Sequence, residues 1–214
     1  MARAKICGLR KLEDVNACIA AGAAFVGFVD FVKSPRHIDP WQAEPLLAAA
    51  SGAVQRVLLT VNATNERLDE WMRGGGIDLI QVQGGESGDR IKQIQDRWGI
   101  PVLKACGLQS AADLDAAVAE FADVANWLLF EAKPPRDSDR PGGNAKRLDW
   151  SILANTQMSI PWMLAGGLDA SNVAEAIAMT GARVVDVSSG VESTSGVKDA
   201  TKIAEFLEAV EAAG

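Results

Sequence analysis

Tyrosine is absent from this sequence of 214 residues, and histidine occurs only once, at His37. A metal site built from several histidines is therefore excluded, as is a phenolic side chain acting as an acid. The sequence has an odd number of cysteines, Cys7, Cys18 and Cys106, and they lack the close spacing of zinc ligands. We therefore expect no disulfide framework and no bound metal, and we interpret His37 as a structural or surface residue.

Positive charge is also in short supply, because 28 acidic residues outnumber 21 lysines and arginines and give a net charge of -7. Binding to nucleic acid favours a basic surface, so we expect no nucleic-acid partner. The sequence has no apolar run of the length that spans a bilayer, which argues against a membrane partner. Residues 1–5 lead into a predicted strand and not into a signal peptide, so we expect a cytoplasmic protein.

The residues that are present form a regular alternation of short apolar segments and segments with apolar residues at helical spacing. No linker divides the chain, so we expect one domain over residues 1–214. The predicted strands are 4–8, 24–29, 54–61, 77–82, 102–105, 127–130 and two more that begin at 162 and 184. The predicted helices are 11–21, 41–50, 65–73, 89–97, 111–120, a short one around 150–153, 171–179 and 199–212, with a polar loop over 131–146.

The predicted strands are largely apolar, which suits a parallel sheet covered on both faces. Eight strand-helix units in this length indicate a closed (β/α)8 barrel, the TIM barrel of the α/β class. A doubly wound sheet is the alternative, but it would need only about five such units. In a barrel, the polar residues at the carboxyl ends of the strands should meet at one mouth.

Two consecutive units end their strands in glycine and hydroxyl residues. The first continues into Gly166 and Gly167, and the second into Ser188, Ser189 and Gly190. Backbone N–H groups in such loops converge on an anion, so the pattern predicts a phosphate site. The simpler interpretation is that these glycines only form tight turns.

Several motifs, in this order, resemble the phosphoribosylanthranilate isomerase family of tryptophan biosynthesis over nearly the whole chain. The motifs are KICG at 5–8, GF at 27–28, SPR at 34–36, a Gln81-x-x-Gly84-x-Glu86 pattern, RPGG at 140–143, LAGGL at 164–168 and DVSSGVE at 186–192. The resemblance implies an Amadori rearrangement of an aminoaldose phosphate to an aminoketose phosphate. Such a reaction needs an acid and a base but no cofactor and no metal.

The resemblance also implies roles for individual residues. Cys7 matches the general base of the family, and Glu131 stands where the family carries an aspartate as general acid. A cysteine thiolate can act as a base, and positive surroundings increase the thiolate fraction; the alternative is an inert buried thiol. The remaining matches are Arg36 to the residue that pairs with the anthranilate carboxylate, Asp186 to a position near the amine, Gln81 to a substrate contact and Gly143 to the phosphate site. Gln83 and Asp30, which differ from the family, are further candidates for substrate contact.

Four positions near the expected mouth depart from the family, namely Asp30, Gln83, Glu131 and Ala145. The longer stem of Glu131 displaces the carboxyl group, and Asp30 would place a negative charge in the pocket with Cys7, raising the pKa of the thiol. We therefore keep two alternatives. One is an altered scaffold, diverged or engineered, with weak native turnover or another reaction with Asp30 as base. The other is a non-catalytic binder of sugar phosphates. In each case the partner is a small phosphorylated molecule, and the protein is a monomer or homodimer.

Overall fold

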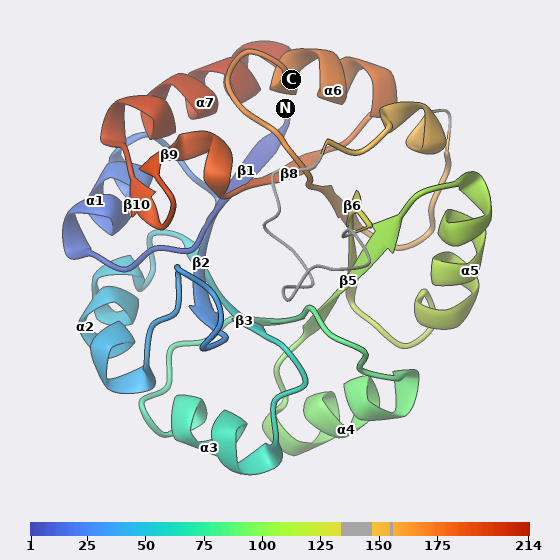
Figure 1. The fold of residues 1–214 in the computed structure, drawn as a ribbon. Helices are drawn as coiled ribbons and strands as arrows, with labels where there is room; N and C mark the ends of the chain where they lie inside the picture. The colour runs from blue at the N-terminus through green and yellow to red at the C-terminus, as the bar shows by residue number, and fades with distance from the viewer. Residues whose placement is uncertain (134–146, 155) are drawn as a thin grey trace.

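The computed structural model describes residues 1–133, 147–154 and 156–214. In this part of the chain, eight parallel strands close into a barrel in the order β1 to β8, with the helices around the outside (Figure 1). The predicted single (β/α)8 barrel is confirmed. The strands are β1 (Arg3–Cys7), β2 (Phe25–Asp30), β3 (Gln55–Thr60), β4 (Leu79–Val82), β5 (Val102–Leu108), β6 (Trp127–Ala132), β7 (Trp162–Leu164) and β8 (Val184–Val187).

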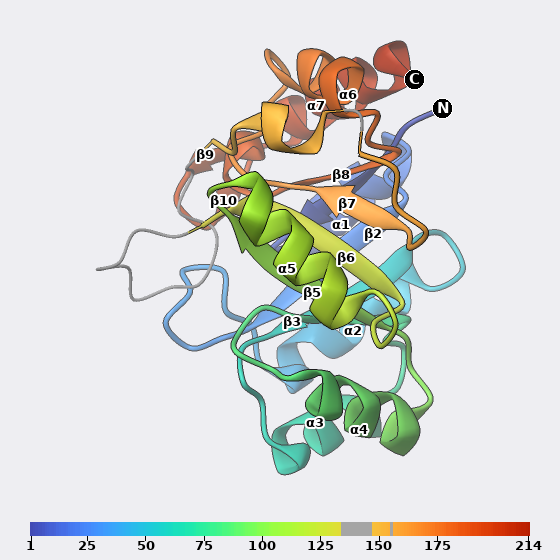
Figure 2. The same ribbon diagram turned by 90° about the vertical axis from the view of Figure 1, so that its right-hand side faces the viewer.

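The helices follow the strands in the order that the sequence predicts, and they pack on the outer face of the barrel (Figure 2). They are α1 (Leu12–Ala20), α2 (Pro40–Ala50), α3 (Asn65–Arg73), α4 (Gly88–Trp98), α5 (Ala111–Phe121), η1 (Trp150–Leu153), α6 (Val173–Thr180) and α7 (Ala200–Ala213), with η1 a 3₁₀ helix. Most start positions reflect capping residues. Thr64, Ser87 and Ser110, for example, each accept a hydrogen bond from a backbone N–H of the first helical turn.

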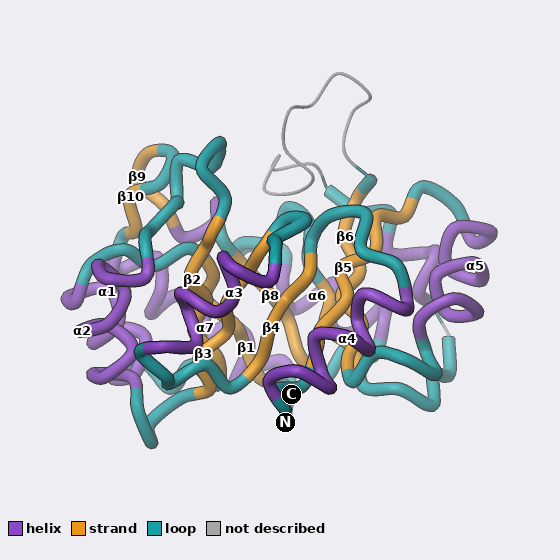
Figure 3. Tube along the Cα trace, turned by 90° about the horizontal axis from the view of Figure 1, so that it is seen from below, coloured by secondary structure: helices purple, strands orange, loops and turns teal. Residues whose placement is uncertain are grey.

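Three details differ from the predicted elements. Glu131 lies within β6 and not in the loop that follows, because β6 pairs with β5 as far as Ala132. A short 3₁₀ helix, η2 (Ser189–Val191), follows β8 directly. After it, β9 (Glu192–Thr194) and β10 (Val197–Lys198) form an antiparallel hairpin that the sequence does not predict. This hairpin lies at the end of the barrel opposite the chain termini (Figure 3).

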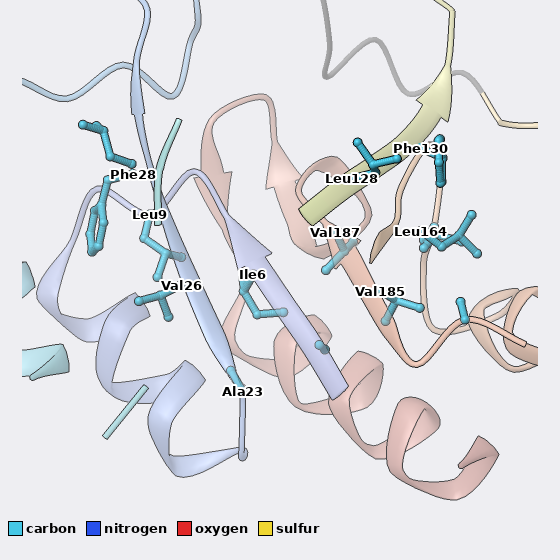
Figure 4. Packing of buried hydrophobic residues seen from close by; sticks show 14 of the residues in the cluster. Ile6, Leu9, Ala23, Val26, Phe28, Leu128, Phe130, Leu164, Val185 and Val187 are labelled. Carbon is cyan, nitrogen blue, oxygen red and sulfur yellow. The ribbon is translucent and has the colours of Figure 1, made fainter. Parts of the chain in front are cut away.

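Apolar side chains from the strands divide into two sets according to the alternation of the backbone. One set packs between the strands and the helices and includes Ile6, Val26, Phe130 and Val185 (Figure 4). The other set forms a smaller cluster of Phe25, Val57, Leu79, Leu103, Ala105, Leu129, Met163, Ala165 and Val184. Its members lie two residues apart along their strands, so they fill the inside of the barrel. The barrel is therefore closed by apolar packing below its mouth.

Replacing Val185 with Ala should destabilise the barrel, because its side chain is fully buried between β8 and the helices. The expected loss in the free energy of unfolding is about 2 kcal/mol. The matched control is Val32→Ala, since Val32 is 81% exposed and the same substitution there should change stability by less than about 0.5 kcal/mol. Urea denaturation of both variants measures the difference, and equal effects would contradict this account of the core.

Candidate active site

A cavity lies at the carboxyl ends of the barrel strands and is lined by residues from most of them. Among the residues predicted for the site, it brings together seven, which are Cys7, Arg36, Gln81, Gln83, Glu131, Asp186 and Ser188. The apolar side chains of Val29, Leu59 and Leu129 form much of the remaining wall. The cavity therefore combines titratable groups with apolar surface at the mouth where a barrel of this type usually carries its site.

Cys7 is the last residue of β1, and its side chain is almost fully buried. The neighbouring position on β2 is Gly27, where an added Cβ would lie 2.9 Å from the Cys7 sulfur. Glycine at this position therefore provides the space for the thiol. Burial raises the pKa of Cys7, while the positive charges of Lys5 and Lys198 oppose the rise. The positive surroundings that we expected are present, but burial outweighs them and the resting group is a thiol.

Lys5 lies two residues before Cys7 on the same strand, so both side chains point into the barrel. Its ammonium group is fully buried and donates a hydrogen bond of 2.7 Å to the carboxylate of Asp186. Lys5 and Asp186 are also direct neighbours in the pairing of β1 with β8. Asp186 reinforces the charged form of Lys5, whose pKa is raised even though burial alone would lower it. Lys5 therefore stays protonated and places a positive charge beside the thiol.

Glu131 projects into the same cavity from β6. Burial raises the pKa of its carboxyl group to about 8, and the negative charge of Asp186 adds to the effect. At neutral pH the group is therefore mostly protonated and able to give up a proton. Gln83 donates a short hydrogen bond from its amide nitrogen to Oε1 of Glu131. A buried thiol and a protonated carboxylic acid consequently face one space, which is the pair that acid-base chemistry requires.

Arg36 is 6% exposed and lies at the rim of the cavity. Its Nε and Nη2 donate hydrogen bonds of 2.7 and 2.8 Å to the two carboxylate oxygens of Glu192. Lys198 donates to the same carboxylate at 2.9 Å, so the β9–β10 hairpin supplies a second cation. Burial opposes the ionisation of Glu192, but these contacts hold its pKa below the usual value. The bidentate pair fixes the plane of the guanidinium, whose Nη1 donates to none of the described residues.

The two glycine-containing loops after β7 and β8 are packed against each other. Gly166 and Gly167 have φ angles of 95° and 69°, a region that favours glycine. An added Cβ on Gly190 would lie only 2.0 Å from the carbonyl oxygen of Leu168, so this contact also requires glycine. Within the described part of the chain, the N–H groups of Gly166 and Gly167 have no hydrogen-bond acceptor. These amides are therefore available to an anion.

The other residues predicted to bind phosphate lie in different parts of the structure. Ser188 lines the cavity and donates a hydrogen bond of 2.9 Å to the carbonyl oxygen of Cys7. Ser189 begins the short η2 turn, in which Gly190 is the next residue. Gly143 and Ala145 lie outside the described residues.

Asp30 does not lie in the pocket with Cys7 and Glu131, and this expectation was wrong. Val29 lines the cavity, and the next side chain along β2 therefore points outward. There the carboxylate of Asp30 accepts hydrogen bonds of 2.6 to 3.1 Å from Arg67 of α3. Its negative charge is thus neutralised outside the barrel, and it is not placed to act as a base in the cavity.

Lys104 and Cys106, at the end of β5, also point away from the cavity. Lys104 donates to the carbonyl oxygen of Gly84 and pairs with Glu86 at 3.2 Å. Cys106 is buried, which raises its pKa to about 12. Cys18, on α1, has a pKa raised to about 12 for the same reason. Burial therefore holds both groups in the thiol form at neutral pH, and neither lines the cavity.

Three residues of the site have no assigned role in the sequence analysis, namely Lys5, Glu192 and Lys198. Lysine in the middle of an apolar strand was the available signal for Lys5, since a buried lysine requires an anionic partner. Nothing in the sequence indicates that Glu192 and Lys198 meet Arg36, because their contact depends on the unpredicted hairpin.

The described residues show neither a metal-binding cluster nor a membrane-spanning helix. Across residues 1–133, 147–154 and 156–214, no three His, Cys, Asp or Glu side chains are grouped so as to hold a metal ion. The helices over the same residues are too short or too polar to cross a bilayer.

Comparison with known proteins assigns the chain to a family. The family model described as N-(5'-phosphoribosyl)anthranilate isomerase matches residues 4–209. The chain belongs to the phosphoribosylanthranilate isomerase family. It is 48% identical to N-(5'-phosphoribosyl)anthranilate isomerase of Cereibacter sphaeroides over 206 residues, covering 96% of this chain and 97% of the relative. The corresponding enzyme of Brucella canis is 45% identical, with 96% of this chain and 92% of the relative covered.

Solved structures of this family share the fold. The structure of the isomerase from Thermotoga maritima superimposes with a TM-score of 0.88 at 31% identity, covering 99% of this chain and all of that one. A second isomerase structure, in complex with reduced 1-(o-carboxyphenylamino)-1-deoxyribulose 5-phosphate, gives a TM-score of 0.82 at 29% identity. It also covers 99% of this chain and all of its own. The family resemblance seen in the sequence motifs is thereby confirmed.

Replacing Lys5 with Met should raise the pKa of Cys7, because the lysine charge opposes the effect of burial on that thiol. Alkylation of the native protein by iodoacetamide, followed across pH by mass spectrometry, measures the change. The inflection for Cys7 should move to higher pH in the variant, while Cys18 and Cys106 stay unreactive in both proteins. An unchanged Cys7 inflection in a folded variant would contradict the proposed influence of Lys5.

Proposed function

We propose that this protein catalyses the Amadori rearrangement of N-(5'-phosphoribosyl)anthranilate to 1-(2-carboxyphenylamino)-1-deoxyribulose 5-phosphate. The observation that carries this proposal is that the carboxyl group of Glu131 and the thiol of Cys7 line the same cavity. The reaction is an isomerisation that moves protons and needs no external oxidant or reductant. The proposal places the enzyme among the intramolecular oxidoreductases, in the aldose-ketose class, and in tryptophan biosynthesis.

In the first step, Glu131 gives its proton to the ring oxygen of the ribose as the bond between C1 and that oxygen breaks. The lone pair of the anthranilate nitrogen forms the C1–N double bond, which yields a protonated Schiff base. In the second step, the thiolate form of Cys7, a minor form because burial raises the pKa of the thiol, takes the proton from C2. The electrons of the C2–H bond shift to give an enolamine. Tautomerisation of the enolamine to the ketone completes the rearrangement.

The remaining residues would hold the substrate in register for these steps. Arg36, with its plane fixed by Glu192, offers its free Nη1 edge to the anthranilate carboxylate. Asp186 lies beside the amine. The phosphate would bind at the amides of the paired loops, with Gly166, Gly167, Ser188, Ser189 and Gly190 as the contacts. Anchoring both ends of the substrate in this way would place C2 against the sulfur of Cys7.

The proposal also covers the binding partner, the localisation and the oligomeric state of the enzyme. The partner is a small phosphorylated substrate, and we place the protein in the cytoplasm as a monomer or homodimer. A dimeric form of the isomerase is described for Thermotoga maritima, which supports keeping the homodimer in the proposal. Gln81 and Gln83, which line the cavity, would contact the substrate.

Replacing Cys7 with Ala should abolish turnover, because no other side chain is proposed to take the C2 proton. The loss of fluorescence of phosphoribosylanthranilate on conversion measures the rate, which should fall by at least about a hundredfold. Glu131→Gln should show a comparable loss, since it cannot donate a proton. Cys18→Ala, outside the cavity, is the matched control and should keep the rate. Wild-type protein that binds the product analogue without turnover would identify a silent binder and overturn the proposal.

The pH dependence of turnover should carry the signature of Glu131. Its pKa is raised to about 8 by burial, so the acid is protonated below that pH and ionised above it. Ionisation of Glu131 should therefore lower kcat/KM at alkaline pH, once the fraction of Cys7 thiolate, whose pKa burial also raises, no longer increases. The ordinary pKa of glutamate is near 4.3, and an acid with that value would already be ionised at neutral pH. A profile of kcat/KM against pH that shows no alkaline decline would contradict the role of Glu131 as acid.

A further inference from the structure

Two glutamines connect the wall of the cavity to the acid. Gln81 and Gln83 both come from the end of β4, two residues apart, so their side chains point into the barrel together. The amide nitrogen of Gln81 donates a 2.6 Å hydrogen bond to Oε1 of Gln83. The amide nitrogen of Gln83 in turn donates to Oε1 of Glu131. The three side chains therefore form one directed chain of hydrogen bonds.

The direction of this chain decides which oxygen of Glu131 carries its proton. Because Oε1 accepts the hydrogen bond from Gln83, the proton of the neutral acid is left on Oε2. If both amide groups rotated by 180°, Oε1 of Gln83 would face Glu131 and would accept the acid proton itself. In that arrangement the proton would point at Gln83 and away from a ligand. Only the observed direction leaves the acid ready to donate.

One end of the chain is unsatisfied. Gln81 is only 1% exposed. Its Oε1 is buried and has no hydrogen-bond partner among the described residues. A buried carbonyl oxygen without a partner costs free energy, and reversing both amides would only replace it with a buried amide nitrogen without an acceptor. A ligand hydroxyl or N–H group that reached Gln81 from the cavity would remove this cost and hold the chain in its observed direction.

We propose that Gln83 is a positioning residue for the proton of Glu131 and that Oε1 of Gln81 accepts a hydrogen bond from a sugar hydroxyl of the substrate. The inference rests on the proposed isomerase function and deepens it. Substrate binding at Gln81 then aligns the acid, because the two events are linked through Gln83. The substrate that Glu131 will protonate therefore helps to orient the proton of Glu131.

The ionisation of Glu131 responds to every group that faces it. Burial and the charge of Asp186 raise its pKa, whereas Lys5 and the hydrogen bond from Gln83 lower it. Removing the Gln83 donor should therefore raise the pKa of Glu131 further, which a purely structural role for Gln83 would not do. This shift gives the test a readout that is separate from the rate.

The decisive variant is Gln83→Met, which keeps the approximate size of the side chain but removes both hydrogen bonds. We expect kcat to fall by about tenfold or more, and by a larger factor than any rise in KM, since the acid loses its alignment while the other substrate contacts remain. The alkaline decline of the pH profile should move to higher pH. Gln93→Met, on the exposed face of α4, is the matched control and should leave both quantities unchanged.

Gln83→Asn serves as a second variant in case the methionine protein does not fold. Its amide is retracted by one methylene and should not reach Glu131 and Gln81 together, so kcat should fall as in the first variant. Gln81→Met should raise KM as well as lower kcat, because it removes the acceptor for the sugar hydroxyl. Folded Gln83 variants with unchanged kcat and pH profile would overturn the positioning role. An unchanged KM in Gln81→Met would overturn the hydroxyl contact.

Carbon-13 NMR of the Glu131 carboxyl group, assigned with Glu131→Gln, separates this inference from the proposed function. The pKa measured in this way should be higher in Gln83→Met than in the wild type even without substrate. Wild-type protein that fails to turn over phosphoribosylanthranilate but shows the shift would refute the proposed function and leave the Gln83 contact intact. Turnover with no shift would refute the inference alone.

Discussion

The buried ion pair of Lys5 and Asp186 is the interaction on which the site depends. It joins the first strand of the barrel to the last, at positions that are direct neighbours in the sheet. A buried charge without a partner is strongly destabilising, so the two residues require each other and the closed barrel that brings them together. Once formed, the pair places a positive charge beside Cys7 and a negative charge near Glu131. One contact therefore influences both Cys7, the proposed base, and Glu131, the proposed acid.

A second buried cluster repeats this arrangement at the rim. Glu192 pairs with both Arg36 and Lys198, which leaves one positive charge in excess, and Lys198 also donates to the carbonyl oxygen of Ser188. The cluster ties the guanidinium to the loop after β8 through the β9–β10 hairpin. Recognition of an aromatic carboxylate and binding of a phosphate would then share one rigid support. The Lys5–Asp186 pair is neutral as a whole, whereas the cluster at the rim keeps one excess positive charge beside the cavity.

The sequence was sufficient for the fold and for most of the site. Apolar strands and glycine-rich loops placed Cys7, Glu131, Asp186 and Ser188 correctly at one mouth. Asp30 was misplaced because β2 is buried on both faces, and a continuous apolar strand does not reveal which side chains point inward. The roles of Glu192 and Lys198 were missed because their hairpin follows a short 3₁₀ turn without a strong hydrophobic pattern. Charge neutralisation between distant residues, as in Asp30 with Arg67, becomes visible only in three dimensions.

A crystal structure of this protein with reduced 1-(o-carboxyphenylamino)-1-deoxyribulose 5-phosphate tests the central claim most directly. The account predicts that the phosphate lies on the amides of the loops after β7 and β8, and that the sulfur of Cys7 faces the second carbon of the sugar. Glu131 should lie on the side of the oxygen that closes the ring in the substrate. A phosphate bound elsewhere, with the second carbon turned away from Cys7, would contradict the account.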